Sequence, residues 1–235
     1  YYDINQKDDF QKLFGDLWIG KHPTSEQGAY QMLTLDFSRV VGSLDDLEVR
    51  FGEYLNIELD TFAHKYAAYY DPDFESRLHA IKDYVSKLNF INSVAKVNNF
   101  QLYLIVDEYD NFTNSVLNEH GEGTYHALTH ASGFYRGIFK LFKGMFTRIM
   151  MMGVSPVTLD DLTSGYSIAT NITFRRPFNS SLGLREDELR TMIRYYIHAG
   201  LINQDEDSII EEMKPWYDHY CFSKESYGKD PSVYN

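Results

Sequence analysis

The sequence predicts an α/β fold, a three-layer sandwich in which helices cover a mostly parallel sheet. Two observations predict this class. Short apolar segments rich in β-branched and aromatic residues alternate with longer segments of helical periodicity. Two of these apolar segments, 30–37 and 102–106, end in or beside acidic residues, as strands do where open parallel sheets bind ligands. The 235 residues, 43% of them hydrophobic, suffice for one large domain with a packed core.

The first part of the chain contains three predicted helices and one predicted strand. Residues 8–18 have apolar side chains on one helical stripe, and residues 30–37 form the first strand, which carries Asp36 near its end. Ser43 begins a helix whose apolar residues recur at spacings of three and four, and Asp71-Pro72-Asp73 ends it. A third helix then has an apolar stripe made by Phe74, Leu78, Ile81, Val85 and Leu88.

The middle of the chain contains two further predicted strands. Residues 102–106 (Leu-Tyr-Leu-Ile-Val) form a strand that we expect to be buried on both faces, because every residue is apolar. Residues 125–146 have helical spacing. A third buried strand is expected at 148–155, where Pro156 stops it, and residues 169–174 are a candidate fourth strand.

The carboxyl-terminal part differs in character. Leu189, Ile193 and Ile197 lie on one stripe of a helix that Gly200 ends as a C-cap, and an aromatic-rich segment follows at 216–223. We therefore expect an α/β core over residues 1–178 and a small helical, aromatic subdomain over residues 179–235.

The end of the second strand carries the candidate catalytic residues. An apolar strand that closes on Asp107-Glu108 has the form of a Walker B element. In such an element the first carboxylate holds Mg²⁺, usually through water, and the second polarises the water that attacks the γ-phosphate. The alternative is that Asp107 or Asp110 caps the next helix together with Asn111. Asp36 is expected at the same edge of the sheet, either to support the metal site or as a cap.

Charge and cysteine content limit the partners and the compartment. The net charge of −12, from 34 acidic and 22 basic residues, gives no support to nucleic-acid or anionic-membrane binding by this segment. No apolar stretch is long enough to span a bilayer. Cys221 is the only cysteine, so we expect a reducing, cytoplasmic location. The start at Tyr1, with neither an initiator Met nor a secretory signal, suggests a piece of a longer chain.

Several motifs carry a specific resemblance to a known family. The longest are Leu102–Asn111 and Gly153–Ile172; the shorter ones are Tyr2-Asp3-Ile4, Phe10 with Leu13-Phe14, Trp216-Tyr217-Asp218 with Tyr220 and Phe222, and Val233-Tyr234-Asn235. In these motifs the chain resembles the AAA-ATPase-like family of bacterial and fungal proteins. The resemblance implies a P-loop ATPase core that uses ATP and Mg²⁺. In longer members of that family a restriction-endonuclease-like domain often follows.

The resemblance also implies roles for individual residues. Asp107 would be the Mg²⁺ carboxylate, Glu108 the catalytic carboxylate, and Ser155 a polar sensor that faces the γ-phosphate. Family members carry the lysine of the glycine loop just before the segment that matches Tyr1, and this sequence has no such Walker A segment. The resemblance therefore implies ATP binding in a longer parent protein, and we expect the chain alone to be inactive.

Alternative interpretations stay open for the other candidates. Ser155 could serve only to hydrogen-bond its turn, and Asp160-Asp161 are more typical of a cap than of a metal site. Arg175-Arg176 could reach a phosphate or be a solvated pair. A different class of function is a non-catalytic protein-interaction module that keeps the nucleotide-binding fold, which the 19 tyrosines favour. We rank nuclease activity last, because the acidic group has no catalytic lysine at useful spacing.

Overall fold

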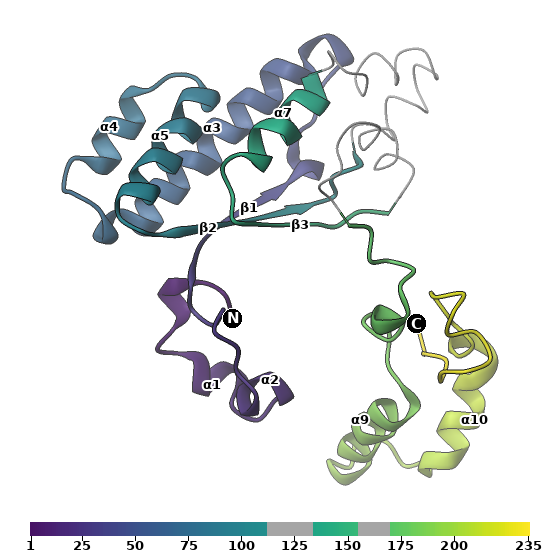
Figure 1. Cartoon of the computed structure of the whole chain (residues 1–235). Coiled ribbons are helices and arrows are strands. Elements are labelled where there is room, and N and C mark those ends of the chain that lie inside the picture. The colour runs from purple at the N-terminus through teal and green to yellow at the C-terminus, as the bar shows by residue number, and fades with distance from the viewer. Residues whose placement is uncertain (112–133, 155–169) are drawn as a thin grey trace. The chain divides into compact units, whose positions relative to one another are not determined.

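The computed structural model of the protein describes residues 1–111, 134–154 and 170–235 (Figure 1). The chain divides into two compact units, Tyr1–Ile168 and Ala169–Asn235. The first unit is a mixed α/β structure with a parallel sheet, and the second is built on a pair of helices. The domain boundary that we expect at residue 178 stays a prediction.

Three parallel strands form the sheet of the first unit. They are β1 (Tyr30–Asp36), β2 (Gln101–Asp107) and β3 (Arg148–Met151), in the order β1-β2-β3. In the register of β1 and β2, Asp36 lies opposite Asp107. The prediction of an α/β fold with a parallel sheet is therefore confirmed, and the three predicted strands are present.

The helices that pack on the sheet lie on one of its faces (Figure 1). Successive right-handed crossovers in one direction across a sheet place their helices on the same face. The core between sheet and helices contains Leu33 and Leu35 of β1 with Leu102, Leu104 and Val106 of β2. The helices of this unit are α1 (Phe10–Phe14), α2 (Trp18–Lys21), α3 (Leu47–Tyr66), α4 (Phe74–Ala80), α5 (Tyr84–Val97) and α7 (Phe134–Lys143).

The strands are less buried than the sequence predicts. Alternate residues of β2, Tyr103 and Ile105, are only partly buried, and Arg148 and Met150 of β3 are exposed. Alternate side chains of a strand point to opposite faces, so these residues point away from the helices described above. Burial on both faces is thus a wrong prediction for these strands, and a third layer stays a prediction.

Two predicted helices are each divided into two. The helix expected over residues 8–18 is α1 and α2, because Leu17 has an extended backbone (φ −81°, ψ 164°) between them. The helix expected from Phe74 is α4 and α5, because Asp83 begins a new helix by accepting a 2.8 Å hydrogen bond from the Ser86 amide. The fourth strand is absent from residues 170–174, the described part of that prediction.

Tyrosine hydroxyls satisfy backbone amides on the outer edge of β1. The Tyr66 hydroxyl accepts a 2.7 Å hydrogen bond from the Met32 amide and donates to Asp3 Oδ1 at 3.0 Å. The Tyr54 hydroxyl accepts a 2.7 Å hydrogen bond from the Asp36 amide. Burial raises the pKa of both phenols. Because both tyrosines come from α3, this helix covers an edge that would otherwise expose unpaired amides.

Replacing Tyr66 with Phe should therefore destabilise the first unit. The Met32 amide and the Asp3 carboxylate would each lose a partner, which costs roughly 1–3 kcal/mol in the free energy of unfolding. Urea denaturation of the chain measures this. Tyr69→Phe is the matched control, because the Tyr69 hydroxyl makes no hydrogen bond within the described residues. Equal stability of the two variants would contradict the role of the Tyr66 hydroxyl.

The second unit is a helical pair with its own small core. Its elements are η5 (Arg176–Phe178), α9 (Glu186–His198) and α10 (Glu206–Tyr217). Leu189, Ile193, Ile210 and Tyr234 form the core. Ion pairs also join the helices: Arg190–Glu206 at 2.9 Å and Arg194–Glu206 at 2.7 Å. Gly200, at φ +71°, follows α9 as predicted. None of the described helices is both long and apolar enough to cross a membrane.

Candidate functional site

Two carboxylates lie side by side at the carboxyl end of the sheet. Asp36 ends β1 and Asp107 ends β2, and the register places them opposite each other on strands about 4.8 Å apart. Leu35 and Val106, their predecessors, are buried against the helices, so both aspartates project from the other face. The expectation that Asp36 shares an edge with Asp107 is confirmed.

Asp36 also has a local structural role. Its Oδ1 accepts hydrogen bonds from the Ser38 amide at 3.0 Å and from Ser38 Oγ at 2.6 Å, which caps the short helix η2 (Phe37–Arg39). The capping interpretation of Asp36 is therefore confirmed. One of its oxygens is committed to that cap, which leaves the other for an additional partner.

Asp107 presents an exposed carboxylate. Its Oδ1 accepts a 2.9 Å hydrogen bond from the Glu108 amide, and Oδ2 has no hydrogen bond within the described residues. Mg²⁺ in nucleotide sites keeps several waters and takes only one or two protein carboxylates. The described residues contain no group of three or more His, Cys, Asp or Glu side chains that could hold a metal. The described residues therefore offer no all-protein cage for a metal ion.

Glu108 adopts a backbone conformation that is unusual for its type. Its φ of +50° lies in the left-handed region, although glutamate has no local preference for it. Such a conformation costs about 1–2 kcal/mol, and residues of this kind cluster at functional sites. Its side chain is half-buried. The unusual backbone aims the Glu108 side chain in a direction that the regular continuation of β2 would not give.

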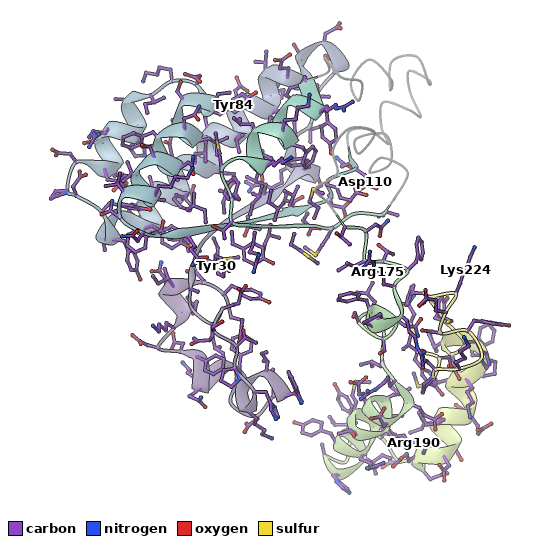
Figure 2. The ribbon with its side chains drawn as sticks, in the orientation of Figure 1. Tyr30, Tyr84, Asp110, Arg175, Arg190 and Lys224 are labelled. Carbon is purple, nitrogen blue, oxygen red and sulfur yellow. The ribbon has the colours of Figure 1, made fainter. Side chains whose placement is uncertain are left out.

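The turn 107–111, which carries Glu108, is fixed to both neighbouring strand ends. On the β3 side, the Tyr109 amide donates to the Met152 carbonyl at 3.1 Å, and the buried Asp110 carboxylate accepts from the Val154 amide at 3.3 Å. On the β1 side, Asn111 Nδ2 donates to the Phe37 carbonyl at 3.4 Å. Asp110 lies at the carboxyl end of the sheet (Figure 2). The acidic strand end therefore holds the segments after β1 and β3, and the alternative that it caps the next helix stays a prediction because residues 112–133 lie outside the described residues.

Gly153 is required by close packing at this point. A Cβ atom there would lie 2.3 Å from Asp110 Oδ1 and 2.7 Å from the Tyr109 ring. No other residue fits without displacing these two side chains. The sequence analysis did not predict the burial of Asp110 or the reason for Gly153. The signal that could have indicated both is a glycine directly after the third strand, because a glycine at such a place often marks the close approach of another segment.

The remaining predicted site residues have separate outcomes. Ser155 and Asp160-Asp161 lie outside the described residues. Arg176 belongs to the second unit and makes a bidentate ion pair with Asp230, both contacts at 2.8 Å. This contact raises the pKa of the Arg176 guanidinium and lowers the pKa of Asp230. Arg176 is thus engaged within its own unit, and Arg175 is exposed to solvent.

One comparison with known proteins identifies a relationship. The model of the family described as "Predicted AAA-ATPase" (AAA-ATPase-like) matches residues 1–163. The match includes all three strands and the turn 107–111. No curated protein and no solved structure shows a significant match to the chain.

Proposed function

Because this chain belongs to the predicted AAA-ATPase family, we propose that the carboxyl end of its sheet is the Mg²⁺-ATP edge of a P-loop ATPase core. The observation that supports this most is the pair Asp107-Glu108 at the end of the middle strand, with Glu108 held at φ +50°. An acidic pair at that place has the form required for hydrolysis of a nucleoside triphosphate.

Each acidic residue has one role in the proposed reaction. Asp107 would hold Mg²⁺, and the metal would supply charge neutralisation at the β- and γ-phosphates. Glu108 orients the attacking water and accepts its proton. Ser155 is proposed to contact the γ-phosphate.

The ATPase proposal requires a phosphate-binding loop outside this sequence. The sequence contains no G-x-x-x-x-G-K-[ST] motif. Three amides on the outer edge of β1 already have acceptors within the chain. The Tyr30 amide donates to the Tyr2 carbonyl, and the Met32 and Asp36 amides donate to tyrosine hydroxyls. A further strand that carries the loop would therefore add beside β3 more readily than beside β1.

Asp107→Asn tests the proposed Mg²⁺ role in the natural full-length protein, including any residues before Tyr1 or after Asn235. The neutral amide binds Mg²⁺ and its water shell less strongly, so we expect ATP turnover to fall about 100-fold. The Mg²⁺ concentration at half-maximal rate should rise at least about tenfold. Hydrolysis measured against Mg²⁺ concentration gives both values.

Asp16→Asn is the control for this test. It removes the same charge from an exposed position and should leave the Mg²⁺ dependence as in the wild type. If Asp107→Asn also kept the wild-type Mg²⁺ dependence, Asp107 would not be the metal carboxylate.

A protein-interaction role without hydrolysis is the second candidate. The second unit exposes large aromatic side chains: Trp216 is 77%, Tyr195 70% and Tyr227 80% exposed. Tyr and Trp are enriched in protein interfaces. This candidate predicts that the natural protein neither binds nor hydrolyses ATP. A cytoplasmic location, which the single cysteine favours, stays a prediction.

A further inference from the structure

We infer that Asp110 is a positioning residue, whose carboxylate fixes the turn that carries Glu108 to the chain that leaves β3. This inference rests on the proposed function, because positioning matters only if Glu108 acts on a water molecule. Asp110 itself would contact neither nucleotide nor water.

The burial of Asp110 is the first support. With 1% of its surface exposed, it is the only fully buried carboxylate within the described residues. A buried carboxylate is costly unless hydrogen bonds compensate for the lost water. Its Oδ1 accepts the Val154 amide, and Gly153 leaves room for that oxygen at a distance that no Cβ atom would allow. The carboxylate and the glycine therefore fit each other.

The fixation of the turn on both sides is the second support. Tyr109 and Asp110 join it to the backbone at Met152 and Val154, after β3, and Asn111 joins it to Phe37, after β1. Within the turn, the Asn111 amide donates to the Glu108 carbonyl at 2.9 Å. An unfavourable φ persists only where surrounding contacts determine it, so these contacts explain how Glu108 keeps φ +50°.

The hydrogen bond between the Val154 amide and Asp110 matters because of the place of Val154 in the sequence. Val154 immediately precedes Ser155, the residue proposed to contact the γ-phosphate. The bond from the Val154 amide to Asp110 thus links the turn that carries Glu108 to the last described residue after β3. A shift of about 1 Å in such an arrangement can lower a rate about 100-fold without weakening substrate binding as much.

The test compares Asp110→Ala with Asp110→Asn in the natural full-length protein. Alanine removes the acceptor of the Val154 amide, whereas asparagine keeps an oxygen at the same place. We expect kcat for Mg²⁺-ATP to fall at least about tenfold in Asp110→Ala, with KM within about threefold of the wild type. Asp110→Asn should restore kcat to within about threefold of the wild type. Steady-state rates below the melting temperature of each variant give these values.

Val154→Pro keeps the test decisive if Asp110→Ala does not fold. Proline removes the donor N–H and leaves the Asp110 side chain unchanged, so the same selective loss of kcat is expected. A wild-type kcat in Asp110→Ala, or a rise in KM alone, would overturn the positioning role while the ATPase proposal stands. No turnover in the wild-type protein would overturn the ATPase proposal, and the positioning role with it.

Discussion

Replacing Glu108 with Gln should lower ATP turnover of the natural full-length protein by about 10²–10⁴-fold and leave its affinity for Mg²⁺-ATP within about threefold. Glutamine is nearly isosteric and can adopt the same backbone, but it cannot accept a proton from the attacking water. Single-turnover hydrolysis gives the rate, and equilibrium binding of a fluorescent ATP analogue gives the affinity. Turnover equal to that of the wild type would exclude Glu108 as the general base.

Two further substitutions make this result specific. Glu48→Gln changes an exposed glutamate in the first turn of α3 and should leave turnover unchanged. Glu108→Gly should abolish turnover yet unfold at equal or higher urea concentration than Glu108→Gln. Glycine adopts φ +50° without the cost of about 1–2 kcal/mol that glutamate has there. This gain exceeds the loss of about 0.5–1 kcal/mol that glycine causes by giving the unfolded chain more conformational entropy.

Gly153→Ala should destabilise the first unit. The added methyl would overlap Asp110 Oδ1 at 2.3 Å and the Tyr109 ring at 2.7 Å, and both side chains are buried. Overpacking of this kind costs about 1–3 kcal/mol, which lowers the melting temperature by roughly 2–12 °C for a chain of this size. Thermal unfolding followed by circular dichroism measures the change.

Gly137→Ala is the matched control, with an expected effect of opposite sign. Gly137 lies within α7, and a Cβ atom there would meet nothing within 4 Å. Alanine should stabilise that helix by about 0.5–1 kcal/mol. If Gly153→Ala were as stable as the wild type while Gly137→Ala behaved as expected, the close packing between Gly153 and Asp110 would be contradicted.

The strands and the acidic edge were predictable from the sequence because local pattern determines them. β1 and β2 are short apolar runs that end on Asp36 and Asp107, and parallel pairing alone brings those two ends together. No comparable pattern indicates which faces are covered. An all-apolar run such as 102–106 is compatible with one helical layer or two, and tertiary packing decides between them.

The features that the sequence did not predict depend on contacts between distant segments. The positive φ of Glu108 follows from hydrogen bonds to residues after β1 and after β3, and not from a preference of glutamate. Likewise, the sequence around Asp110, which follows two other acidic residues, suggests an exposed side chain. Its burial depends on Gly153, which lies 43 positions later. The tyrosine hydroxyls on the edge of β1 are a third case, since α3 supplies them from 18 and 34 residues away.

The most direct test of the central claim is ATP hydrolysis by the natural full-length protein, measured with Mg²⁺ and again with the metal removed by a chelator. We predict turnover that requires Mg²⁺ and that is absent from the 235-residue chain alone, whose sequence contains no Walker A motif. A full-length protein that neither binds nor hydrolyses Mg²⁺-ATP would contradict the ATPase account, and would instead favour a nucleotide-binding fold used for protein interaction.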